Sequence, residues 1–201
     1  MPEQSSAQRQ ALIEHLRKEP RGSANRQGEH VVRLIAAVEQ GYPADLSTPE
    51  ALSQLEGAWE LRWSSSRQPY LAVAPWLENL QCLAPSQGRG MNLLRPAGPL
   101  GTLAGIAVEA SIAVEPAAAD SDAHAPVQRV QVQFQRGGWL GPRAGQRQLH
   151  WLRKVNQSFP AWLHITMLDD ELRICRGNAG TVFALLRRRE LNVLELLARL
   201  E

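Results

Sequence analysis

The stretch from Trp162 to Leu186, WLHITMLDDELRICRGNAGTVFALL, decides how this chain folds. Its pattern predicts three short strands joined by two tight turns, Asp169-Asp170 and the Gly-Asn-Ala-Gly at 177–180. Asp, Asn and Gly tolerate the positive φ that tight hairpins require. Between the turns, apolar and polar side chains alternate over 172–175, which is the spacing of a strand with one buried face.

A second stretch, Leu55 to Trp63, is expected to be the partner of this block at the start of a β-barrel. Its Trp59, Leu61 and Trp63 alternate with polar side chains. Further alternating runs predict strands near residues 77–83, 91–94, 101–115 and 130–135. Many short alternating strands with turn signals between them favour a sandwich or a closed barrel, here with about eight antiparallel strands. The predicted fold class is therefore mostly β.

Helical periodicity is confined to the two ends of the chain. Residues 1–54 are expected to form an N-terminal helical region, residues 55–189 the barrel and residues 190–201 a C-terminal helix. The segment 116–126, rich in Ala, Asp and Pro, predicts a mobile surface loop. Residues 139–157 are poorly patterned and predict a loop across an opening, with a turn at Gly137-Gly138 before it and a short helix near 149–155.

Composition excludes several classes of function. The 201 residues carry a net charge of only +2, which does not indicate the concentrated basic surface that nucleic-acid binding usually requires. The two cysteines have no zinc or disulfide spacing and are expected to be buried thiols. The five histidines are scattered and no nucleophile motif is present, so we expect no enzyme, no metal and no cofactor. No apolar run is long enough to span a membrane, and no secretory signal or transit peptide is evident.

The triplet Gly57-Ala58-Trp59 resembles the signature at the start of the first lipocalin strand. In that fold the tryptophan plugs the closed end of the barrel, and an arginine from the last strands packs over its ring. An indole face attracts a guanidinium, so this pair seals an apolar interior. The resemblance implies that Gly57, Trp59 and either Arg173 or Arg176 close the barrel.

The C-terminal block resembles the plastid lipid-associated proteins, also called fibrillins. The carrying motifs are Trp162-Leu163 and residues 168–178, LDDELRICRGN, and Arg21-Gly22, 55–66 and 129–134 fit in the same order. The resemblance covers about residues 10 to 186. This sequence departs from the family pattern at Met167, Cys175 and Trp63, where tyrosine, serine and tyrosine are usual. Those departures leave the particular ligand open.

The resemblance implies a lipocalin-like protein that binds or coats hydrophobic molecules of photosynthetic membranes: carotenoids, quinones or acyl lipids. A non-catalytic binder with a ligand inside the barrel is the first hypothesis. Its expected ligand-binding residues are Trp63, Ile106, Val108, Val132, Phe134 and Met167. The alternative is a filled barrel that coats lipid or thylakoid surfaces through leucine seams at 12/16 and 191/194/197. The expected location is cytoplasmic and peripheral to the thylakoid in a cyanobacterium, or the plastid in a eukaryote.

Overall fold

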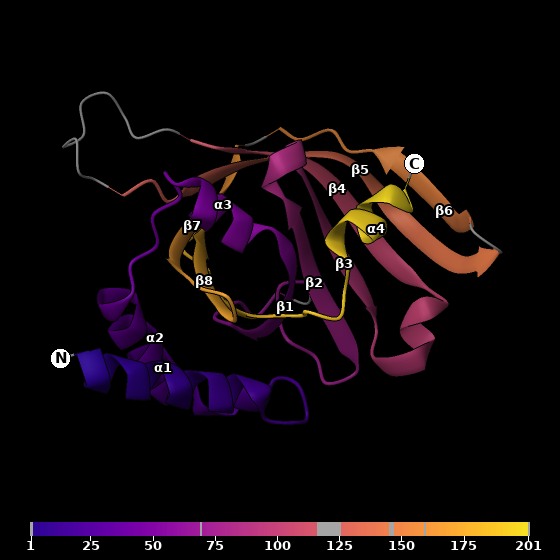
Figure 1. Ribbon diagram of the computed structural model, residues 1–201. Helices are drawn as coiled ribbons and strands as arrows, with labels where there is room; N and C mark the ends of the chain where they lie inside the picture. Colours follow the sequence, from indigo (N-terminus) through magenta and orange to yellow (C-terminus); the bar gives the residue numbers. More distant parts are fainter. Residues whose placement is uncertain (1, 69, 116–125, 145–146, 159, 201) are drawn as a thin grey trace.

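The computed structural model describes residues 2–68, 70–115, 126–144, 147–158 and 160–200 (Figure 1). The predicted loop at 116–126 lies, apart from Pro126, outside the described residues. The α-helices are α1 (Pro2–Arg17), α2 (Gly28–Gly41), α3 (Pro49–Leu55) and α4 (Val193–Ala198). The strands are β1 (Gly57–Ser64), β2 (Leu77–Ala84), β3 (Arg89–Pro96), β4 (Gly105–Val114), β5 (Arg129–Ala144), β6 (Arg147–Lys154), β7 (Ala161–Leu168), β8 (Leu172–Gly177) and β9 (Val182–Arg187).

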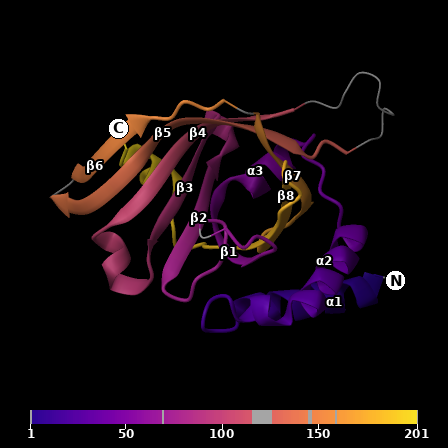
Figure 2. The ribbon, with the colours of Figure 1, turned by 180° about the vertical axis from the view of Figure 1, so that it is seen from behind.

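The strands form one antiparallel sheet that closes on itself. Its order is β4-β3-β2-β1-β9-β8-β7-β5-β6, and a pairing between β4 and β5 closes an eight-stranded ring. This confirms the predicted barrel, and β1 pairs with β9 as expected. The first part of β5 pairs with β7 and its second part with β6, so the sheet flares away from the ring at β6 (Figures 1 and 2).

The region 137–157 differs from the prediction. Gly137 and Gly138 do not form a turn but lie inside β5, where they face β4 and β6. Residues 147–154 form strand β6 rather than a helix. The many arginines and glycines obscured the strand pattern because β6 lies on the flared edge, where neither face needs a continuous apolar stripe.

Two β-bulges decide which side chains enter the barrel. The register of β1 against β9 shifts between Leu61 and Trp63, and that of β7 against β8 shifts between Ile165 and Met167. A bulge inserts one extra residue and breaks the alternation of a strand. Leu61 and Ile165 therefore pack inside the barrel, whereas Trp63 and Met167 pack in the cluster under α1 and α2.

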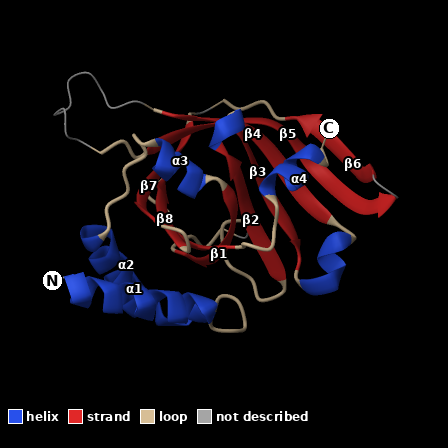
Figure 3. Ribbon diagram, in the orientation of Figure 1, coloured by secondary structure: helices blue, strands red, loops and turns tan. Residues whose placement is uncertain are grey.

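Helices α1, α2 and α4 pack against the outside of the barrel, whereas α3 lies at its closed end (Figure 3). In α1, Leu12 and Leu16 are 0% and 1% exposed and lie in one cluster with Trp63. Helix α4 begins at the cap of Asn192 and places Leu197, 1% exposed, against β2 and β3. The leucine seams expected to dock on a membrane are thus mostly buried against the protein itself; Leu194 is the exception, at 41% exposure.

The predicted turn at Asp169-Asp170 is confirmed and also anchors α1. The Asp169 Oδ1 accepts hydrogen bonds from the backbone N–H groups of Glu171 and Leu172, both at 2.8 Å. Its Oδ2 lies 2.6 Å from Arg9 Nε of α1. Burial alone would raise the pKa of Asp169, but these hydrogen bonds hold it below its ordinary value.

A cluster of ion pairs holds the connection between α1 and α2 against the outside of β1 and β2. Its two carboxylates, Glu60 and Glu78, are only 3% and 5% exposed. Arg21 Nε lies 2.5 Å from Glu60 Oε1, and Arg21 Nη2 lies 3.2 Å from Glu78 Oε1. Arg62 and Arg188 contact Glu60 at 3.2 Å and 2.7 Å. Glu60 is therefore shared by three arginines that are far apart in the sequence.

Candidate functional site

A cavity of about 410 Å³ opens into one end of the barrel. Its walls are the inward faces of β2–β5 and β7–β9 together with Gln68, Tyr70 and Leu71 after β1 and the β8–β9 turn. Most of the lining is apolar, and Tyr70 stands at the rim with 64% of its surface exposed. The other half of the barrel is filled by a cluster that includes Trp59, Leu61, Ile165 and Leu185. The barrel is thus partly hollow and partly solid.

Half of the expected ligand-binding residues line this cavity. These are Val108, Val132 and Phe134. The bulges turn Trp63 and Met167 away from the interior, to 3% and 0% exposure under the N-terminal helices. Ile106 shares a strand face with Val108 but is 55% exposed, because β4 extends beyond the mouth of the barrel at that point. The expectation of an inward position was therefore wrong for Trp63, Met167 and Ile106.

Trp59 seals the closed end, as the lipocalin resemblance implied. Its side chain is fully buried, and its Nε1 donates to the carbonyl oxygen of Leu55 at 3.0 Å. That carbonyl belongs to the last turn of α3, so the bond ties the helix to the barrel floor. The guanidinium of Arg173 lies 5.2 Å from the indole centroid. This distance is within the range of a cation–π interaction.

Arg176 does not contribute to the closure. It lies on the outside of β8, where its Nη2 pairs with Glu39 of α2 at 2.6 Å. The second cation over Trp59 is Arg187 of β9, 4.3 Å from the ring centroid. Arg187 also donates to the carbonyl oxygens of Gln54 and Glu56 at the end of α3. Nothing in the sequence distinguishes Arg187 from its neighbours Arg188 and Arg189 as the arginine that would lie over Trp59.

Gly57 makes room for this arrangement. Its φ is +148°, and a Cβ at this position would lie 2.5 Å from Arg187 Nη1. We expect Gly57→Ala to lower the free energy of unfolding by about 2 kcal/mol, through backbone strain and displacement of Arg187 from the indole. Urea unfolding measures this change. Gly28→Ala is the control because a Cβ there meets nothing within 4 Å. Equal stability of the two variants would contradict the assigned role of Gly57.

An exposed apolar ledge continues from the mouth along the flared sheet. It consists of Ile106, Trp139, Leu149 and Trp151, which are 45–64% exposed. Ile106 pairs with Trp139, and Trp139 pairs with Trp151, so these three form one row across β4, β5 and β6. The guanidinium of Arg153 lies over the Trp151 ring at 4.6 Å. The ledge therefore combines aromatic surface with positive charge.

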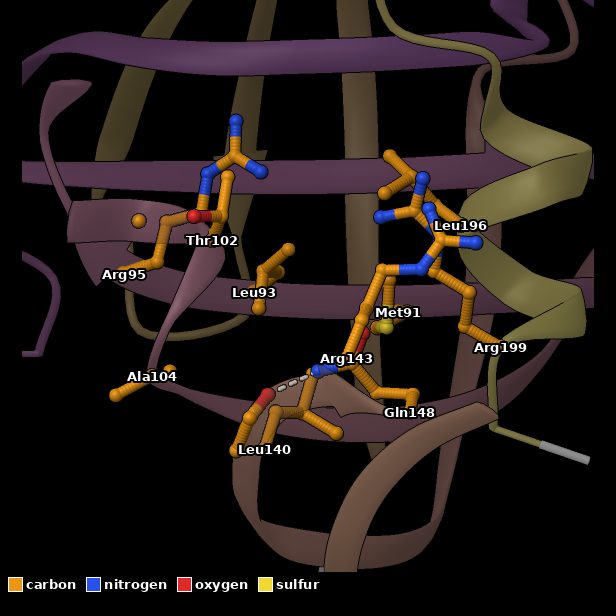
Figure 4. Close-up of a pocket in the computed structure, with 13 residues that line it drawn as sticks. Met91, Leu93, Arg95, Thr102, Ala104, Leu140, Arg143, Gln148, Leu196 and Arg199 are labelled. Carbon is orange, nitrogen blue, oxygen red and sulfur yellow. Dashed lines mark hydrogen bonds between the residues drawn. The ribbon is translucent and has the colours of Figure 1, made fainter. Parts of the chain in front are cut away.

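A second, smaller depression of about 160 Å³ lies on the opposite face of the flared sheet, beside α4 (Figure 4). Its apolar base includes Met91 and Leu93, but Arg95, Arg143 and Arg199 surround it. Burial and the charges of Arg143 and Arg95 lower the pKa of Arg199. Its small size and cationic rim make this depression a poorer host for an apolar molecule than the barrel cavity.

The two cysteines are buried free thiols, as predicted. Burial raises the pKa of Cys82 to about 12 and also raises that of Cys175, so neither is a thiolate near neutral pH. Among the described residues, no group of three or more His, Cys, Asp or Glu side chains is arranged to hold a metal ion. In the same part of the chain, every helix is too short or too polar to cross a membrane.

Comparison with known proteins identifies the family. A profile of the PAP_fibrillin family matches residues 6–186, which is most of the chain and contains the barrel up to the last residue but one of β9. Neither the curated proteins nor the solved structures with which the chain was compared include a match. The profile match and the plugged barrel agree with the motifs at 162–178 and 55–66. The chain belongs to the PAP_fibrillin family, the plastid lipid-associated proteins.

Proposed function

We propose that this protein binds one hydrophobic small molecule or lipid in the barrel cavity and does not transform it. The observation that carries this proposal is the apolar cavity of about 410 Å³ above a sealed floor. Ligand sites are typically apolar hollows of roughly 300–1,000 Å³ with a few polar groups. Burial of the ligand would supply about 25 cal/mol per Å² of apolar surface. Membership of a lipid-associated family supports a carotenoid, a quinone or an acyl lipid of photosynthetic membranes as the ligand.

A variant that fills the cavity tests this proposal. Val108 lines the cavity, whereas Ile106, two residues away on the same strand, is 55% exposed outside it. We expect Val108→Trp to weaken binding of the uncharged dye Nile red by roughly tenfold or more, because the indole occupies space that the dye must enter. Ile106→Trp is the matched control and keeps wild-type affinity. Dye fluorescence titrations measure both, and equal affinity of the two variants would place the binding site elsewhere.

The apolar ledge favours a second role, peripheral contact with a lipid surface such as the thylakoid membrane. Tryptophan is favoured at membrane interfaces because its ring is apolar and its N–H can remain hydrated. Arg153, which lies over Trp151, adds a cation that anionic head groups attract. The ledge continues the strand face that bears Val108 in the cavity wall. A membrane held against the ledge would thus lie close to the cavity mouth.

Removing the two ledge tryptophans tests this contact. We expect the double variant Trp139→Ser/Trp151→Ser to reduce the partition coefficient onto vesicles containing anionic lipid by at least about tenfold, given the apolar area lost. Flotation of protein with the vesicles measures it. Trp76→Ser is the control, because Trp76 is 68% exposed but precedes β2, outside the ledge. Unchanged flotation of the double variant would exclude the ledge as the contact.

A further inference from the structure

The barrel floor contains a buried positive charge without a counter-ion. Arg173 is fully buried, and only its Nη2 has a hydrogen-bond acceptor, the Oε1 of Gln81. Its Nε and Nη1 donate to no atom in the part of the chain that the structure describes. The neighbouring charge on the floor is another cation, Arg187, which also lies over Trp59. A buried ion normally requires a partner of opposite charge, and these described residues supply none.

The same arginine orients the polar group at the base of the cavity. Gln81 lines the cavity and pairs with Trp59 across β1 and β2, so it lies at the level of the floor. Because its side-chain oxygen accepts from Arg173, its Nε2 is left with two N–H donors. Among the described residues, no protein acceptor receives them. The base of an otherwise apolar cavity therefore offers the N–H donors of Gln81, and the positive charge of Arg173 is buried directly behind them.

We propose that the cavity takes a single-chain lipid carboxylate, with its head group at Gln81, in front of the buried charge of Arg173, and its hydrocarbon chain toward the mouth. A carboxylate accepts hydrogen bonds from the Gln81 amide and carries the negative charge that the buried Arg173, hydrogen-bonded to the same side chain, lacks. The chain would lie along the apolar wall that includes Val108, Ile112 and Phe134. This inference rests on the proposed function and adds the chemistry and direction of the ligand.

A series of ligands that differ only in the head group tests the inference. Laurate, dodecanol and methyl laurate compete against Nile red for the wild-type protein, each below the concentration at which it aggregates. We expect laurate to bind roughly ten- to hundredfold more tightly than dodecanol or the ester, since a hydrogen bond to a charged partner is worth that much. In Arg173→Met, which keeps the volume but removes the charge, laurate should lose this advantage while dodecanol retains its affinity.

The matched control is Arg176→Met, because Arg176 lies outside the barrel and pairs with Glu39. This variant should keep the preference for laurate. Equal affinities for laurate and dodecanol in the wild-type protein would overturn the inference, as would an Arg173→Met variant that still prefers laurate. Nile red binding in either case would leave the proposed function standing. Failure of the wild type to bind Nile red or any of the three lipids would refute both. The wild-type comparison decides the matter even if Arg173→Met does not fold.

Discussion

Trp59→Ala should lower the free energy of unfolding by about 3–5 kcal/mol, the usual cost of truncating a buried tryptophan. Trp59 is fully buried at the closed end. Its loss would leave the Leu55 carbonyl without its donor and remove the aromatic face that stabilises Arg173 and Arg187. Such a loss is large against the roughly 5–15 kcal/mol that stabilises a typical domain. Urea unfolding followed by far-UV circular dichroism measures it.

Two further variants separate the parts of this effect. Trp59→Phe keeps an aromatic face for the arginines but loses the hydrogen bond to Leu55, so we expect a smaller loss of about 1–2 kcal/mol. Trp151→Ala removes a tryptophan that is 64% exposed and should change stability by less than about 0.5 kcal/mol. If Trp59→Ala were no less stable than Trp151→Ala, Trp59 would not be the plug of the barrel.

The second large effect is expected at Glu60, whose carboxylate is shared by Arg21, Arg62 and Arg188. Glu60→Gln would leave these cations poorly compensated in a site where Glu60 itself is 3% exposed. Removing one partner of a buried ion pair costs about 3–5 kcal/mol. Glu190→Gln is the control, because Glu190 pairs with Arg188 from a side chain that is 60% exposed, where an ion pair contributes at most about 1 kcal/mol. Equal stability of the two variants would contradict the assigned role of Glu60.

The same site predicts how stability depends on pH. Burial would raise the pKa of Glu60, but hydrogen bonds from Arg21 and Arg188 and the charge of Arg62 outweigh burial and hold the pKa below the ordinary 4.5. A carboxylate with a lowered folded-state pKa stabilises the protein above its unfolded-state pKa, and this contribution is lost as pH falls through the folded-state value. Urea midpoints measured from about pH 6 down to about pH 3 should therefore fall less steeply for Glu60→Gln than for wild type. If the urea midpoints of the two proteins fell in parallel as the pH was lowered, the assigned role of the Glu60 carboxylate in the pH dependence would be wrong.

The sequence predicted the barrel, but only half of the side chains expected to line its cavity do so. Hairpin turns and alternating runs are local signals, so the Asp169 turn and the pairing of β1 with β9 could be anticipated. A bulge leaves no comparable pattern in the sequence, and each bulge moves the side chains that follow it to the opposite face of the sheet. Trp63 and Met167 were consequently assigned to the interior, although they cover the outside of the barrel beneath α1 and α2.

The polar parts of the site depend on contacts between distant residues. The resemblance paired Trp59 with either Arg173 or Arg176, and only Arg173 lies over the ring. Arg187 was missed because it lies in a run of three arginines. Arg21 matched a family motif without an evident reason, and its partners Glu60 and Glu78 come from two strands of the barrel. Long-range ion pairs of this kind leave no periodicity in a single sequence.

The most direct test of the account is the native mass of the protein after incubation with a total lipid and pigment extract of photosynthetic membranes. We predict one ligand on each chain, released by organic solvent and absent from Val108→Trp. A bare protein mass for the wild type, with the protein still floating on vesicles through its ledge, would contradict the proposed binding of a ligand in the barrel cavity. The protein would then be a coat on lipid surfaces.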